Sequence, residues 1–234
     1  MSGKHGAMRT LAGTAASALA PRLVGMAPTF TTGFLHTALE RALTGVGPLP
    51  PAAQAAEAQL AEQHGDRDKA VREVIENHVA YAAAGGFATN LGGLVTAAVT
   101  IPANVTGLAL IQCRMVAGIA HLRGYDLDDP RVRNAILVSL LGEDKVDSMV
   151  NKLRLPAPPM ALATAPVFDA GTDRAVANEV ATEMMARVAG KRVAVAASKR
   201  VPIIGGVVGA GADGWGTFQL GRYAAREFLP RPGF

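Results

Sequence analysis

Apolar residues recur at helical spacing along most of this chain, and glycine or proline separates the recurring stretches. Between Val71 and Ala82 the apolar positions fall three or four residues apart, as on one face of a helix. Asp66 stands just before this stretch and is a typical N-cap residue. A helix rich in alanine and glutamine is predicted between Pro51 and Gly65. Because no run alternates apolar and polar residues between turn signals, the pattern predicts an all-α protein.

The longest uncharged stretch runs from Asn77 to Cys113 and contains no Asp, Glu, Lys or Arg. It exceeds the roughly 20 residues that cross a bilayer, but Gly85-Gly86, Gly92-Gly93 and Pro102 interrupt it. In lipid, the backbone groups freed at such breaks would find no partner. We therefore predict two packed helices joined between Gly92 and Pro102, held within the protein or dipping into one leaflet without crossing. The fold predicted is a compact multi-helix bundle with a glycine-rich apolar helical hairpin.

The second half of the chain shows further helices with recognisable ends. An apolar face recurs from Val105 to Leu122, and Gly124 follows it as a stop. Asp129 and Pro130 combine an N-cap with a proline at the first helical position, which predicts a helix over residues 130–141. The remaining predicted elements are a helix over 143–153, a proline-rich loop over 156–171, and a helix over 172–199 capped by Thr172 or Asp173.

Residues 1–51 differ in composition from the rest of the chain. They are rich in Gly, Ala, Thr and Pro and end in the stiff segment Gly47-Pro48-Leu49-Pro50-Pro51. We predict a flexible or partly helical leader over residues 1–51 and one helical domain over residues 52–234. A chain of 234 residues is long enough to bury the core of one such domain.

Five basic residues precede a second glycine-rich apolar segment near the C-terminus, with no acidic residue among them. Basic charge beside an apolar segment is typical of contact with an anionic membrane, where each basic residue contributes about 1 kcal/mol. The alternative is a solvated helix face followed by a buried helix. The basic residues predicted to contact a membrane or ligand, which we call the basic cluster, are Arg187, Lys191, Arg192, Lys199 and Arg200.

The net charge of +4 also favours an anionic partner. Aromatic residues make up only 5% of the chain, and its basic residues do not alternate with Phe or Tyr. Proteins that bind single-stranded DNA or RNA stack its bases on aromatic side chains. We therefore expect an anionic membrane surface or lipid as the partner, and no nucleic acid.

No motif in the sequence indicates a cofactor. Gly209, Gly211 and Gly214 match the spacing of the dinucleotide fingerprint, but too few residues follow for a βαβ unit. Close packing of helices is the other interpretation of these glycines. The histidines lack the spacing of metal ligands, so we expect no metal and no other cofactor.

Two residues are candidates for chemistry or ligand contact within apolar surroundings. Cys113 lies beside Arg114, which could lower the thiol pKa, and His78 or His121 could act as its base; a small core residue is the alternative. Asp213 lies among apolar neighbours, where a carboxylate costs several kcal/mol unless it is paired. Its predicted partner is Arg114 or a residue of the basic cluster. Alternatively, Asp213 caps a helix that begins at Trp215.

Several short segments recur in a fixed order: Gly85-Gly86-Phe87-Ala88-Thr89-Asn90-Leu91-Gly92-Gly93, Ile101-Pro102-Ala103-Asn104, Gln112-Cys113-Arg114-Met115, Ile119-Ala120-His121, Gly124-Tyr125-Asp126, Leu140-Leu141-Gly142, the run from Lys199 to Gly209, and Gly221-Arg222-Tyr223-Ala224-Ala225-Arg226. In this succession the chain resembles the EcsC protein family over about residues 65–230. Asn90 departs from the glycine that is more usual there, and the leader lies outside the resemblance.

The resemblance implies a mostly helical bacterial protein at the cytoplasmic side of the cell membrane. The family's namesake is encoded beside an ABC exporter and is linked to secretion and membrane traffic. The resemblance implies no catalytic residues. The function it favours is a non-enzymatic, membrane-associated accessory protein, peripheral to the inner face of the cell membrane, with a membrane protein as a further partner.

Two other functions stay open from the sequence. One is a lipid or amphiphile carrier, whose helices between Gly85 and Ala120 would form an apolar cleft gated by Arg114. The other is a hydrolase that uses Cys113 or Asp213, which would require a histidine within hydrogen-bond reach of one of them.

Overall fold

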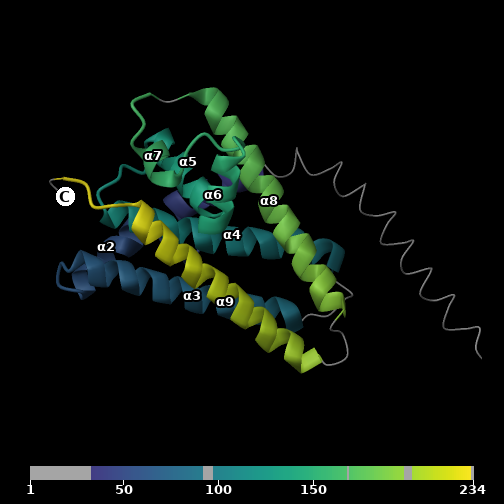
Figure 1. The fold of residues 1–234 in the computed structure, drawn as a ribbon. Helices are drawn as coiled ribbons and strands as arrows, with labels where there is room; N and C mark the ends of the chain where they lie inside the picture. The colour runs from purple at the N-terminus through teal and green to yellow at the C-terminus, as the bar shows by residue number, and fades with distance from the viewer. Residues whose placement is uncertain (1–32, 92–96, 168, 198–201, 233–234) are drawn as a thin grey trace, which may run out of the picture.

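The computed structural model describes residues 33–91, 97–167, 169–197 and 202–232. Its description covers the backbone alone for residues 85–91, 97–106, 185, 187–197 and 202–210. Within the described residues the fold is helical and holds no strand beyond an isolated bridge between Val46 and Leu49, which confirms the all-α prediction (Figure 1). The helices are one over 33–44, then α2 (Ala52–Glu62), α3 (Arg67–Leu91), α4 (Ala97–Leu122), α5 (Pro130–Ser139), α6 (Glu143–Asn151), α7 (Pro159–Ala163), α8 (Ala170–Ala197) and α9 (Pro202–Glu227).

The helices form two groups that meet at α4 and α5. Helices α2, α3, α4 and α9 pack against one another, and α5 packs against α6, α7 and α8 (Figure 1). Every residue from 113 to 120 of α4 is buried, and so is every residue from 134 to 141. The single apolar face predicted for α4 was therefore too narrow, because neighbours surround residues 113–120 and leave them no solvent side.

Helix α3 follows its prediction closely. The Asp66 carboxylate accepts a hydrogen bond from the Lys69 N–H at 2.9 Å, which confirms it as the N-cap. The apolar positions Val71, Val74, Ile75 and Ala82 are buried, together with His78. Helices α3 and α4 pack together, and the Arg67 guanidinium at the start of α3 donates to the Leu122 carbonyl at the end of α4 at 3.1 Å, so the pair is antiparallel. Residues 92–96, which join them, lie outside the described residues, so the glycine-rich turn of the hairpin stays a prediction.

Helix α9 packs against α3 through glycines. A Cβ added at Gly221 would lie 2.9 Å from both Ile75 Cγ atoms and 3.1 Å from Met115 Sδ. A Cβ added at Gly214 would lie 3.4 Å from Ala83 Cβ. At both positions the absence of a side chain lets the two helices approach, which agrees with a packing role for Gly214.

Two helix starts differ from their predictions. Helix α4 begins at Ala97 instead of past Pro102, so this proline lies in its second turn and removes a single hydrogen bond there. Helix α8 begins at Ala170, and the carboxylate of Asp169 accepts hydrogen bonds from the N–H and hydroxyl of Thr172 at 2.7 and 2.8 Å. The cap is therefore Asp169. The predicted caps Thr172 and Asp173 lie inside the first turn.

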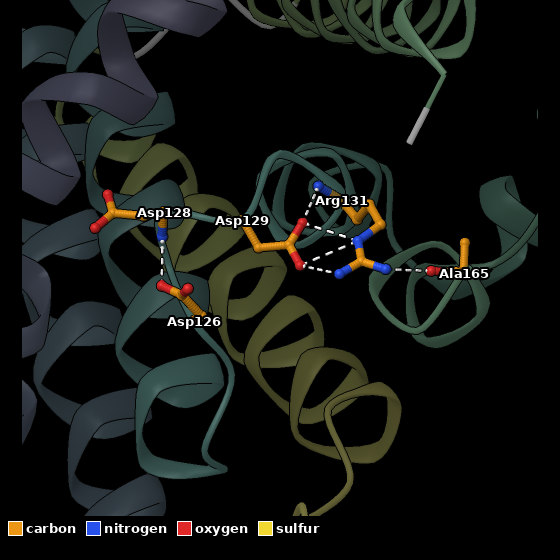
Figure 2. A network of polar contacts seen from close by, with 5 residues as sticks. All are labelled: Asp126, Asp128, Asp129, Arg131 and Ala165. Atoms are coloured by element: carbon orange, nitrogen blue, oxygen red, sulfur yellow. Dashed lines mark hydrogen bonds and ion pairs between the residues drawn. The ribbon is translucent and has the colours of Figure 1, made fainter. Parts of the chain in front are cut away.

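The start of α5 confirms its predicted cap and ties two segments together. The Asp129 carboxylate accepts hydrogen bonds from the Arg131 N–H at 2.8 Å and from the Arg131 guanidinium at 2.5 to 3.0 Å (Figure 2). This guanidinium lowers the pKa of Asp129, chiefly through the side-chain hydrogen bonds. Arg131 also donates to the Ala165 carbonyl (Figure 2). One side chain thus fixes α5 to the segment that follows α7.

Part of the predicted leader contributes to the core. The helix over residues 33–44 buries Leu35 and Leu39, and its Glu40 pairs with Arg133 of α5 at 2.8 Å. Residues 1–32 lie outside the described residues. The domain boundary at residue 51 stays a prediction.

Candidate functional site

Three long helices bring their least charged segments to the same end of the bundle. Gly214 of α9 lies against Val79 and Ala83 of α3, and Gly221 lies against Ile75, so α3 and α9 are antiparallel. Gln112 of α4 donates to Thr217 of α9 at 3.3 Å, and Met115, one turn on, faces Gly221. Helices α4 and α9 therefore run in the same direction, and both begin where α3 ends.

We call this part of the molecule the uncharged end, defined as residues 82–91 of α3, 97–110 of α4 and 202–212 of α9. None of these residues is Asp, Glu, Lys or Arg. Helix α8 ends five positions before α9 begins, so its last turns reach the same end. In Figure 1 the end of α3, the start of α4, the end of α8 and the start of α9 all lie toward the right of the molecule.

Helix α8 brings the basic cluster to this end. Arg187, Lys191 and Arg192 lie in the second half of α8, where the backbone is described and the side chains are not. Lys199 and Arg200 lie outside the described residues. In the sequence, no acidic residue occurs between Glu183 and Asp213 or between Glu76 and Asp126. The uncharged end thus carries no charge, and the part of α8 that adjoins it carries basic charge only.

Arg114 lies apart from this end. Its side chain is 6% exposed and donates to the Pro50 carbonyl. Burial lowers its pKa, and the nearby Tyr81 hydroxyl opposes this effect. The contact with Pro50 joins α4 to the residues just before α2, so Arg114 has a structural role in the described contacts.

Asp213 lies within α9, eleven residues after the helix begins at Pro202. The interpretation of Asp213 as the cap of a helix that starts at Trp215 is therefore wrong, because α9 is continuous through both residues. The neighbouring Gly214 does not end the helix and packs against α3. Its pairing with Arg114 or with the basic cluster stays a prediction.

A cleft of about 480 Å³ opens beside Asp213, between α4, the start of α6, α8 and α9. Its apolar lining comes from Leu108, Leu140, Leu141, Met184 and Leu220. Two of its charged lining residues pair with side chains outside the lining: Lys145 with Glu183 at 2.7 Å, and Glu143 with Arg226. Arg114, the predicted gate, is not one of the residues that line this cleft.

Two of the titratable groups considered for catalysis, Cys113 and His78, are held uncharged at neutral pH. Cys113 is fully buried, and burial raises its pKa to about 12, so it is a thiol at neutral pH. His78 is buried with Nδ1 2.7 Å from the Val74 carbonyl, and burial lowers its pKa to about 4. His121 lies 2.6 Å from the Glu57 carboxylate. Neither histidine is paired with Cys113 in the described contacts.

The described residues contain no group of three or more His, Cys, Asp or Glu side chains that could hold a metal ion. Among the helices that the structure describes, none combines the length and apolar character needed to cross a membrane.

Comparison with known protein families gives a match over most of the chain. The EcsC protein family matches residues 52–231, which include α2 to α9, the cleft and the uncharged end. No curated protein and no solved structure matches the chain at a significant level.

Proposed function

Because the chain belongs to the EcsC protein family, we propose that it is a non-enzymatic accessory protein that binds the anionic inner face of the bacterial cell membrane. The observation that carries this proposal is the convergence of three uncharged helix segments at one end, beside a part of α8 whose only charges are basic. Apolar segments can enter the lipid there while basic residues meet the headgroups.

The charges support binding of moderate strength. Five basic residues at about 1 kcal/mol each provide about 5 kcal/mol toward an anionic leaflet. Such an interaction is screened by salt, because the Debye length falls to about 3 Å at 1 M ionic strength. The proposal therefore describes a reversible, peripheral contact, with an ABC exporter or another secretion component as a partner met at the membrane surface.

Sedimentation with lipid vesicles tests this proposal. The purified protein is mixed with vesicles of phosphatidylglycerol and phosphatidylcholine, or with phosphatidylcholine alone, at low and at high salt. We expect binding to the anionic vesicles that weakens as salt rises, and little binding to the neutral vesicles. Equal binding to both, or binding to neither, would overturn the proposal.

The cleft supports a second candidate function, the binding of a lipid or other amphiphile. Its volume of about 480 Å³ lies within the range of small-molecule sites, and five of its lining residues are leucine or methionine. Native mass spectrometry of the purified protein would show a bound amphiphile, and Met184→Trp should displace it because the larger side chain would fill the cleft. Protein that carries no amphiphile, before and after incubation with lysolipid, would remove this candidate.

A further inference from the structure

One buried asparagine of α5 has no hydrogen-bond partner among the described contacts. Asn134 is 3% exposed, and its Oδ1 is enclosed by the protein without a donor. A buried polar atom that lacks a hydrogen bond destabilises the folded protein, and native proteins contain few such atoms. Asn134 therefore needs an explanation, because a leucine of similar size would fill the same space without this cost.

Asn134 lines a cavity of about 220 Å³ between α5, α7 and the start of α8. The cavity shares no lining residue with the cleft beside Asp213. Its floor holds Asn134 and Leu162, which are both buried, whereas Ala161 and Val167 at its rim are exposed, so it opens to solvent. Since a cavity of about 150 Å³ holds benzene, this one has room for about nine non-hydrogen atoms.

The charged residues of the lining already have partners. The Arg131 guanidinium binds the Asp129 carboxylate and the Ala165 carbonyl (Figure 2). The Asp169 carboxylate accepts hydrogen bonds from the N–H and hydroxyl of Thr172. Because one charged residue of each sign lines the cavity, a charged ligand would lose its hydration there without gaining a free counter-charge. The lining therefore favours an uncharged ligand.

The polar groups of the lining lie at two depths. The Asn134 amide is at the buried floor, whereas Arg131 and Asp169 are at the more exposed rim. Rotation about the Cβ–Cγ bond exchanges the two ends of the Asn134 amide, so this side chain can offer a ligand either a donor or an acceptor. The apolar residues of the lining are Pro156, Ala157, Ala161, Leu162, Ala165 and Val167. A matching ligand carries one uncharged polar group inside, a second near the rim, and a small apolar part between them.

An extended peptide has this pattern. Its successive amides each carry a donor and an acceptor and are separated by a single Cα atom, and one capped alanine has about the size of the cavity. We propose that the cavity binds an uncharged amide of the peptide type, with one amide hydrogen-bonded to Asn134 and the next at the rim. The source of the amide is either a short apolar segment of a protein or a free capped amino acid. This site does not depend on the proposed membrane binding.

Nuclear magnetic resonance of the full-length protein tests the proposal. The isotope-labelled protein is titrated with N-acetylalanine amide while the spectrum records the Asn134 side-chain amide and the backbone amides of Ala161 and Ala165. We expect saturable shifts at these positions, with a dissociation constant of about 1 mM for a ligand of this size. N-acetylalanine, which has a free carboxylate, should bind about tenfold more weakly because its charge must be desolvated. Equal binding of the two compounds would overturn the assignment of an uncharged ligand.

The N-acetylated amide of trialanine separates the two sources of the ligand. Severalfold tighter binding than that of the single capped residue would identify a peptide segment of a protein. Equal affinity would identify a free capped residue. Either result, with shifts at Asn134, supports the site.

Asn134→Leu keeps the volume of the side chain and removes its amide. We expect binding to fall about tenfold while stability against urea stays the same or rises, because an unpartnered polar group leaves a buried position. A purely structural Asn134 would give the opposite result, a loss of stability with unchanged binding, and this would overturn the proposal.

Ala161→Phe places a large side chain at the exposed rim, where it should block the cavity and leave the core undisturbed. Ala175→Phe is the matched control, because Ala175 is also exposed in a helix and does not line the cavity. We expect the first variant to abolish the shifts and the second to keep them. Absence of shifts at Asn134 in the wild-type protein would overturn the proposal. Wild-type binding by Ala161→Phe would overturn it as well, also where Asn134→Leu fails to fold.

Discussion

The segment over residues 123–154 and the uncharged end hold their helices together in different ways. The first contains α5 and α6. Three of its charged side chains reach across to other elements, in the pairs Arg123 with Asp68, Arg133 with Glu40, and Lys145 with Glu183. A fourth pair, Arg131 with Asp129, lies within the segment at the start of α5. The uncharged end has no charged residue with which to form such a pair. Ion pairs thus fix the first region to its neighbours, whereas the second depends on packing and, in our proposal, on lipid.

This difference indicates how the two regions divide their roles. When one member of a buried or half-buried ion pair is lost, the other charge is left without a partner, which costs free energy. The ion pairs of residues 123–154, which we call the paired segment, therefore favour one arrangement of their helices. The uncharged end has no charge that needs a partner, so its surface can lie against lipid as well as against water. The α3–α9 contact joins the two roles, because it sets the level at which the uncharged end begins.

The largest effect on stability is expected from breaking that contact at Gly221. The added Cβ of Gly221→Val would lie 2.9 Å from the Ile75 Cγ atoms and close to Met115 Sδ. We expect the free energy of unfolding to fall by about 3 kcal/mol, as in overpacked cores, measured by urea denaturation. Gly216→Ala is the control, because an added Cβ there meets nothing within 4 Å. Equal stability of the two variants would contradict the close α3–α9 approach.

The start of α5 could be predicted from sequence because the signals lie within a few residues. Asp129 and Pro130 are adjacent, and the cap they predict is the one observed. The start of α8 was missed because Asp169 lies in a proline-rich stretch that was assigned to a loop, and Thr172 satisfied the same rule. By residue type alone both Asp169 and Thr172 can cap a helix, and only the position at which α8 begins shows that Asp169 is the cap.

The cleft and the register of α3 against α9 could not be predicted in this way. The cleft takes Leu108, Leu140, Met184 and Leu220 from segments that are far apart in sequence, and no spacing rule connects them. The register of α3 against α9, which places Gly214 against Val79 and Ala83, is likewise not revealed by a sequence without an alignment. The basic cluster was visible in the sequence, and the structure adds which helix ends adjoin it.

A smaller effect is expected from the titration of His78. Its pKa is lowered from 6.5 to about 4, first by burial, with the charge of Arg114 acting in the same direction. The unfolded chain therefore takes up a proton below pH 6.5 before the folded protein does, so stability is present above this pH and is lost as pH falls toward 4. By pH 5 the loss is about 2 kcal/mol.

Denaturation at pH 7 and pH 5 measures this loss, and His78→Leu should remove most of it. His64→Gln is the control, because His64 is exposed. If His78→Leu keeps the full dependence on pH between these values, the buried imidazole is not its source.

A loss of about 1 kcal/mol is expected from Asp129→Asn, which keeps a capping side chain but removes the carboxylate that pairs with Arg131 (Figure 2). Because this change affects the paired segment alone, vesicle binding should stay at its wild-type level. Reduced binding would show that the two regions are not independent. Asp173→Asn, in the first turn of α8, is a matched control for the loss of one carboxylate near a helix start.

Two triple variants show whether the uncharged end and the adjoining basic residues bind an anionic membrane. Arg187→Gln, Lys191→Gln and Arg192→Gln together remove three charges beside the uncharged end, whereas Arg41→Gln, Lys152→Gln and Arg174→Gln remove three exposed charges elsewhere. At about 1 kcal/mol each, the first set should weaken binding to phosphatidylglycerol vesicles about 100-fold. The second set should weaken it far less. Equal losses in the two variants would mean that net charge alone drives binding. An unchanged affinity in the first variant would contradict membrane binding through the basic residues of α8.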